Sequence, residues 1–354
     1  MHMHRKRYCV LLICLFLITS AYGCGGGLRK PLLQARPEVD AYYMNNPGGS
    51  DDSFPSLQAH ADLLNEISPL WYHVRTDGSL DKDVNSQALA VARQNGIKVV
   101  PLVNLVPSQD AILHDTAAED RAISNLTQEV KTNNYNGIDI DFEFIPDSAH
   151  KDFTVDRDRL TTFIKKMYTA MSNMKKETQM AVLPHVGVPE AMAGVYDYGA
   201  LAPYLTKVTI MTYDHSEAAS PPGPVAPFSW VEQNITTAIK QGFKPGQICL
   251  GVATYGYDWP SGKAGGFSRP TKEIMNQVAT KGYKVKWSDK YQEPFYTYTG
   301  EGGTPRVVWF ENDATLQTKI DLVKKYNLAG IDIWRLGFED QKFWSRIASA
   351  WGMK

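Results

Sequence analysis

The chain has 354 residues, of which 43% are hydrophobic and 21% are charged, so it can bury a large core and fits one barrel-sized domain or two smaller ones. Its formal net charge of -1 gives no electrostatic case for binding nucleic acid. The four cysteines show neither a disulfide framework nor the spacing of metal ligands, so we expect no metal and no organic cofactor.

Residues 1–24 have the pattern of an export signal. A basic segment at His4-Arg5-Lys6-Arg7 precedes an apolar run from Cys9 to Ile18, which is too short for a comfortable transmembrane helix. Gly23-Cys24 resembles the end of a bacterial lipoprotein signal, although that signal prefers Leu in place of Ala21 and a small residue in place of Tyr22. We therefore expect an exported bacterial protein. It is either lipidated at Cys24, which we favour, or simply secreted.

A glycine-rich linker, residues 25–36, follows the signal and would act as a flexible tether. Strand and helix patterns then alternate through a main domain at residues 37–354. The predicted strands are Glu38–Met44, Pro69–Val74, Ile97–Val103, Gly137–Phe144, Met180–Val188, Lys207–Tyr213, Ile248–Tyr255 and Gly330–Trp334. The predicted helices are residues 57–66, 86–95, 118–131, 157–176, 230–240 and 342–351.

Eight such strands predict an α/β fold closed into a (β/α)8 TIM barrel. An open doubly wound sheet is the alternative, but no Gly-x-Gly-x-x-Gly follows a strand at the start of a helix. About seventy residues separate the seventh and eighth predicted strands, and three segments among them alternate with period two. They predict a small inserted α+β lobe at about 261–310.

The predicted strand at 137–144 carries three acids at alternate positions, Asp139, Asp141 and Glu143. Alternate side chains share one face of a strand, and the other face here is apolar, formed by Ile138, Ile140 and Phe142. The simple interpretation is a half-exposed edge strand with a polar face. We favour an acid-bearing catalytic strand inside the barrel, because the flanking sequence predicts strand–helix units.

Active sites of such barrels lie at the C-terminal ends of the strands, so Glu143 is nearest to the active face. A general acid must be protonated at working pH, and repulsion from Asp141 would help to raise its pKa. Asp139 lies deeper and could share a proton with Asp141. These positions predict a catalytic group made of Glu143, Asp141 and Asp139.

The acidic segment resembles the Asp-x-x-Asp-x-Asp-x-Glu signature of glycoside hydrolase family 18, the chitinase-like enzymes. Three of the four acids match, whereas the first position, mainly structural in that family, is Asn136 here. The resemblance implies a retaining, substrate-assisted mechanism in which the 2-acetamido oxygen of the sugar attacks the anomeric carbon. Glu143 would be the general acid and then the base. Asp141 would orient the acetamido group and stabilise the oxazolinium ion.

The segment Met211-Thr212-Tyr213-Asp214 matches the Met-x-Tyr-Asp element of the same family. The resemblance implies that Tyr213 holds the acetamido carbonyl and that Met211 and Asp214 belong to the substrate site. It also implies that Trp334 floors the −1 sugar site, although a buried core tryptophan is the alternative. Tyr42 and Trp230 are weaker candidates for contact with sugar.

The chain looks most similar to the branch that contains spore-germination and spore-cortex-lytic glycosidases. Segments that carry this likeness include Ser220–Pro227, Gly251–Trp259 and Val308–Glu311, while the peptidoglycan-binding repeats usual in that branch are absent from this sequence. The resemblance implies a β-N-acetylglucosaminidase or chitinase-like hydrolase that acts on a GlcNAc-containing polysaccharide. We favour peptidoglycan over chitin as this polysaccharide.

A catalytically silent sugar-binding protein is the alternative function, and a germination or assembly factor is a third. We expect contact with a membrane only through the lipid anchor. Oligomeric state and endo or exo cleavage stay open.

Overall fold

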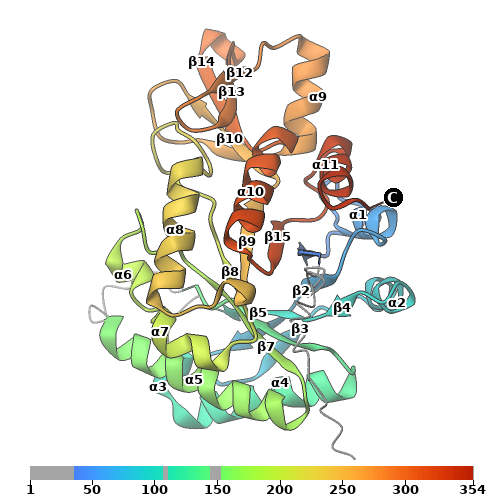
Figure 1. The fold of residues 1–354 in the computed structure, drawn as a ribbon, viewed down its shortest axis with the longest axis vertical. Coiled ribbons are helices and arrows are strands. Elements are labelled where there is room, and N and C mark those ends of the chain that lie inside the picture. The colour runs from blue at the N-terminus through green and yellow to red at the C-terminus, as the bar shows by residue number, and fades with distance from the viewer. Residues whose placement is uncertain (1–35, 107–110, 144–152, 354) are drawn as a thin grey trace, which may run out of the picture. The chain divides into compact units, whose positions relative to one another are not determined.

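Eight parallel strands close into a barrel, which confirms the predicted TIM-barrel fold (Figure 1). The computed structural model describes residues 36–106, 111–143 and 153–353. Each strand pairs with the next around the barrel, and the last strand pairs with the first. In order these are β1 (Glu38–Tyr43), β2 (Glu66–Arg75), β5 (Leu102–Val106), β6 (Gly137–Ile140), β7 (Glu177–Val182), β8 (Lys207–Ile210), β9 (Ile248–Ala253) and β15 (Gly330–Trp334).

Helices cover the outside of the barrel, and side-chain oxygens cap several of their first turns. Asn85, Asp115 and Asn312 each accept two backbone N–H bonds at a helix start, which satisfies groups that would otherwise lack partners. The longer helices are α1 (Phe54–His60), α2 (Ser86–Gln94), α4 (Thr116–Thr132), α5 (Phe153–Asn173), α8 (Phe228–Gln241), α10 (Asp313–Tyr326) and α11 (Gln341–Trp351). Shorter helical segments include α3 (Ala111–His114), α6 (Glu190–Ala193) and α7 (Tyr198–Leu201).

Several predicted boundaries were wrong, among them the end of the strand predicted at Met180–Val188, which stops at Val182. Three other errors have a local reason. The first helix starts three residues early, with Pro55 in its first turn, and ends at His60, so Glu66 begins a strand instead. The third predicted strand is broken at Pro101, which has no N–H to donate, into β4 (Lys98–Val99) and β5. The regular ladder of the acidic strand ends at Ile140 rather than at 144.

An antiparallel five-stranded sheet forms the inserted lobe (orange in Figure 1). Its strands run in the order β11-β10-β14-β13-β12, and α9 (Thr271–Lys281) packs Ile274 against Tyr296, Val308 and Phe310. The bounds are β10 (Tyr255–Pro260), β11 (Phe267–Pro270), β12 (Lys286–Ser288), β13 (Glu293–Thr299) and β14 (Pro305–Phe310). The lobe therefore starts directly after β9, at Tyr255, and not near 261. The remaining strand, β3 (Leu80–Lys82), pairs with β2 in the antiparallel direction.

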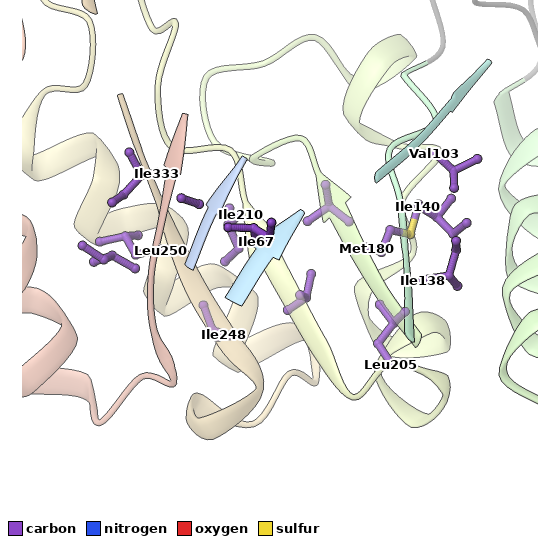
Figure 2. Packing of buried hydrophobic residues seen from close by; sticks show 14 of the residues in the cluster. Ile67, Val103, Ile138, Ile140, Met180, Leu205, Ile210, Ile248, Leu250 and Ile333 are labelled. Atoms are coloured by element: carbon purple, nitrogen blue, oxygen red, sulfur yellow. The ribbon is translucent and has the colours of Figure 1, made fainter. Parts of the chain in front are cut away.

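The apolar core lies between the barrel strands and the helices around them. Ile138 and Ile140 of the acidic strand point outward into this core, beside Val103 and Met180 of the neighbouring strands (Figure 2). All four side chains are fully buried. Outward-facing residues therefore supply most of the hydrophobic stabilisation, which leaves the inward-facing positions free for polar groups.

A buried ion cluster fills the barrel interior near the beginning of the strands. The Lys207 ammonium group lies 2.6 Å from Asp40, 2.8 Å from Glu38 and 3.2 Å from Glu66. Cys249 is a buried free thiol and donates to Asp40 at 3.4 Å. Burial raises the pKa of Asp40 to about 7 and that of Glu66 to about 8, against the opposing charge of Lys207. The cluster is thus held together by one cation.

Residues 36–354 form one compact unit that contains every strand and helix described above. The predicted signal with its lipidation site Cys24, and the predicted linker up to residue 35, lie outside the described residues. Within the described part of the chain, no helix has the length and apolar character needed to span a bilayer.

Candidate active site

Asp139 in β6 and the two acids that follow it, Asp141 and Glu143, lie along the chain from the barrel interior to its mouth. Extended pairing continues past the ladder, because the Asp141 N–H donates to Val103 at 2.9 Å. Asp139 is 1% exposed and Asp141 is 3% exposed, whereas Glu143 is exposed. The alternation predicted from the sequence thus places all three on the inner face, with Glu143 outermost.

Asp139 is the deepest of the three, and neither of its carboxylate oxygens has a hydrogen-bond partner among the described residues. Burial raises its pKa well above the usual range, and the nearby charges of Asp332 and then Asp141 add to the shift. Asp332, on β15, accepts a hydrogen bond from Thr209 at 2.7 Å. Burial without a hydrogen-bond partner in the described part of the chain therefore favours the protonated form of Asp139. Sharing of that proton with Asp141 stays a prediction.

Asp141 and Glu143 form the pair next to the mouth. Asn104 on β5 donates to Asp141 across 3.4 Å, while the other oxygen of Asp141 has no hydrogen-bond partner among the described residues. Burial, followed by the charge of Glu143, raises the pKa of Asp141. Glu143 is accessible to solvent, but the surrounding protein partly desolvates its carboxyl group. This desolvation and the charge of Asp214 raise its pKa. A raised pKa suits a carboxyl group that must donate a proton.

The loop after β8 brings Asp214 to the same mouth. Asp214 has a left-handed backbone (φ 58°), and one of its oxygens accepts hydrogen bonds from Tyr255 at 2.6 Å and Tyr257 at 2.9 Å. Tyr213 is 9% exposed and packs in one cluster with Met211 and Tyr255. Burial raises the pKa of Tyr213, and the charges of Asp141, Glu143 and Asp214 add to the shift, so its hydroxyl stays protonated. This hydroxyl is therefore available as a hydrogen-bond donor.

Tyr42 and Trp334 lie together where β1 and β15 end. Their ring centroids are 5.1 Å apart at an interplanar angle of 59°. Tyr42 is 1% exposed and Trp334 is half-buried, so the indole offers an accessible apolar surface that Tyr42 supports. Trp230, by contrast, is buried, and its Nε1 donates to Val186 at 2.6 Å, which indicates a packing role.

Several residues of this site were not foreseen, although the sequence contains a signal for some of them. Asp332 stands two positions before Trp334 and so shares its face of β15, and Tyr255 and Tyr257 alternate in the same way on β10. Asn104 has no comparable signal. Asn136 lies at the opposite end of the β6 segment, where it accepts a hydrogen bond from the Val99 N–H at 3.0 Å. Its contact is structural, consistent with the expected role of the first motif position.

The described residues contain no group of three or more His, Cys, Asp or Glu side chains placed to hold a metal ion. The chemistry that the arrangement itself can support is proton transfer by Glu143 next to a second carboxyl, beside a tyrosine hydroxyl and an exposed indole face.

Comparison with known proteins relates this geometry to a family. Uncharacterized glycosylase YvbX of Bacillus subtilis (strain 168) is 27% identical over 315 residues, which are 84% of this chain and 88% of that protein. The cortical fragment-lytic enzyme of Bacillus anthracis is 25% identical over 296 residues, 80% of this chain and 67% of that enzyme. The chitinase from Chromobacterium violaceum ATCC 12472 shares the fold, with a TM-score of 0.80 at 24% identity over 89% of this chain and 98% of its own. The model of the glycosyl hydrolases family 18 matches residues 92–339, well over half of the sequence, and this extent shows that the chain belongs to glycosyl hydrolase family 18.

Proposed function

We propose that this glycosidase cleaves β-1,4 bonds at N-acetylglucosamine in peptidoglycan or chitin by a retaining, substrate-assisted mechanism. The observation that carries the proposal is the position of two carboxyl groups on the inner face just after β6. Glu143 is exposed at the mouth, and Asp141 is buried two positions earlier on the same face. A conventional retaining enzyme needs a second carboxylate free to attack the sugar from its other face. Asp214, another acid at the mouth, is already bonded to two tyrosine hydroxyls.

In the first step, the Glu143 carboxyl donates its proton to the glycosidic oxygen as the bond to the anomeric carbon breaks. The acetamido carbonyl oxygen of the same sugar forms the new bond to that carbon. Asp141 accepts a hydrogen bond from the acetamido N–H and balances the positive charge of the oxazolinium ion. Tyr213 donates to the acetamido oxygen, and Trp334 supports the sugar ring.

In the second step, Glu143, now a carboxylate, takes a proton from water, and the resulting hydroxide attacks the anomeric carbon. The acetamido group leaves, and the product keeps the β configuration. Peptidoglycan as the substrate is supported by the likeness to the cortical fragment-lytic enzyme, and chitin by the shared fold of the chitinase. Export and lipidation of Cys24 are part of the proposal and are supported by the sequence pattern of residues 1–24.

The participation of the acetamido group is tested with paired oligosaccharides. We expect hydrolysis of chitin oligomers, with the β-anomer appearing first in proton NMR spectra, and no hydrolysis of fully deacetylated oligomers of the same length. An initial α-anomer, or equal rates on both substrates, would contradict the mechanism. Saturable binding of both chitin oligomers and peptidoglycan without turnover of either would favour the catalytically silent alternative.

The charge of Asp214 predicts a shift in the pH profile. Glu143 acts as an acid only while it is protonated, so kcat/KM falls as the pH rises through its pKa, which Asp214 raises. Asp214→Asn removes this charge and so lowers the pKa of Glu143. The fall of kcat/KM on the alkaline side of the pH profile then moves to lower pH, independently of any change in the maximal rate. Asp321→Asn, at an exposed position on α10, is the matched control and should leave the limb unchanged. If kcat/KM of the Asp214→Asn variant fell at the same pH as in the unaltered chain, or at a higher pH, the assignment of Glu143 as the acid would be refuted.

A further inference from the structure

The barrel end opposite the active site carries a concentration of cationic side chains. Several helices around the barrel have a basic residue in their last turn, among them Arg93 in α2, Lys131 in α4 and Lys240 in α8. Helices of a parallel barrel end where its strands begin, so these cations lie at the end away from Glu143. The adjoining loops and strand starts add Lys98, Lys175, Lys176 and Lys244. We call these seven residues the basal cations.

Two neighbouring hollows on the described surface bring several of these cations together. One has a volume of about 360 Å³ and is lined by Arg93, Lys98 and Lys176, with no acidic side chain in its lining. The other has a volume of about 930 Å³, lies between α4 and α5, and is lined by Lys131, Lys166 and Lys176. Its lining contains one acid, Asp120, which pairs with Lys166 at 2.9 Å. Both hollows include Lys176, so they form one continuous basic surface.

Stabilisation of helix ends explains only part of this pattern. A cation in the last turn interacts favourably with the helix dipole, which accounts for Arg93, Lys131 and Lys240. The other four basal cations lie outside the helices. At the active-site end, several loops after the strands carry acids, among them Asp77, Asp83, Asp214 and Glu217, while the inserted lobe on that side carries exposed lysines as well. The basal cations are therefore a local concentration of positive charge on a chain whose net charge is only -1.

The chain enters the barrel at this same basic end. β1 begins at Glu38, so the segment before it joins the barrel beside the basal cations. Thirteen residues, 25–37, connect Cys24 to this point and can span at most about 45 Å when fully extended. A lipid on Cys24 would therefore keep the basic end, and not the catalytic mouth, close to a membrane.

We propose that the basal cations dock the barrel on an anionic phospholipid membrane, with the active site turned away from the lipid. Lysine and arginine side chains near a surface of anionic lipids are attracted to it over about one Debye length, so several must act together. Docked in this way, the mouth at Glu143 faces the polysaccharide outside the membrane.

The test is cosedimentation of the unlipidated chain, lacking residues 1–24, with vesicles of phosphatidylcholine alone or mixed with phosphatidylglycerol. This shorter chain keeps the whole compact unit 36–354 and needs neither lipidation nor hydrolysis, so failure here is distinct from failure of the proposed function. The variant combines Arg93→Gln, Lys131→Gln, Lys176→Gln and Lys244→Gln. The matched control removes the same charge from exposed lysines of the lobe through Lys263→Gln, Lys281→Gln, Lys284→Gln and Lys290→Gln.

We expect the unaltered chain to bind only the vesicles with phosphatidylglycerol, and to bind them less as salt is added. The variant that lacks four basal cations should bind these vesicles with an affinity lower by roughly tenfold or more, while the control variant should keep most of the affinity of the unaltered chain. Equal binding to both vesicle types, no binding to either, or an equal loss in the control would overturn the proposal. Thermal melts of both variants verify that the fold is retained.

Discussion

Replacing Glu143 by glutamine is expected to lower turnover on a GlcNAc polymer by roughly 10²–10⁴-fold, the usual contribution of general acid–base catalysis. Glutamine has nearly the same shape but no acidic proton, so it cannot protonate the leaving oxygen. Glu143 is exposed at the mouth and packs little of the core, so the melting temperature should stay close to that of the unaltered chain. Release of reducing ends and a thermal melt measure the two effects.

The control for this prediction is Glu190→Gln, which makes the same chemical change at an exposed glutamate on α6. It should leave turnover and stability unchanged. If Glu143→Gln retained full turnover, the assignment of Glu143 as the general acid would be wrong.

Replacing Lys207 by methionine is expected to destabilise the fold by roughly 3–5 kcal/mol, the usual cost of removing one partner from a buried ion pair. Lys207 is 6% exposed and is the cation that Asp40, Glu38 and Glu66 share. Without it, two fully buried carboxyl groups must lose their charge or stay unpaired. Chemical denaturation at neutral pH measures the loss, and Lys281→Met on the lobe surface should change stability by no more than about 0.5 kcal/mol.

The loss on replacing Lys207 should depend on pH. Asp40 and Glu66 have folded pKa values of about 7 and about 8, above their ordinary values of 3.8 and 4.5. Such groups stabilise the fold at low pH, and this contribution is lost as the pH rises through the folded pKa. Removal of Lys207 raises both pKa values further. The loss in the free energy of unfolding, relative to the unaltered chain, should therefore be larger at about pH 9 than at about pH 5. Adding Asp40→Asn and Glu66→Gln should recover part of the stability, and an equal loss at both pH values would contradict this account.

The fold was largely predictable from the chain because its signals are local. Alternating apolar segments predicted all eight barrel strands, and the last, Gly330–Trp334, was placed with its observed bounds. Errors arose where one residue changes the backbone, as at Pro101, or where two strands follow each other without a loop, as in β9 and β10 on either side of Thr254. A periodic pattern contains little information about such breaks.

The site was predictable only in part. The period of two placed Asp139, Asp141 and Glu143 on one inner face, and the roles assigned to them came from the family signature. The sequence could not predict that Asp332 would be the charged neighbour with the largest effect on Asp139, because the two residues lie on strands far apart in the chain. The same holds for Lys207, whose partner Asp40 is 167 positions away.

The most direct test of the account is mass spectrometry of the products formed when the chain lacking residues 1–24 is incubated with purified peptidoglycan and, separately, with chitin oligomers. We predict fragments that end in reducing N-acetylglucosamine, from peptidoglycan in preference to chitin. Chitobiose from chitin alone would make the protein a chitinase and contradict the wall substrate. The absence of any product, together with saturable binding to the glycan, would contradict the claim that this barrel hydrolyses its ligand.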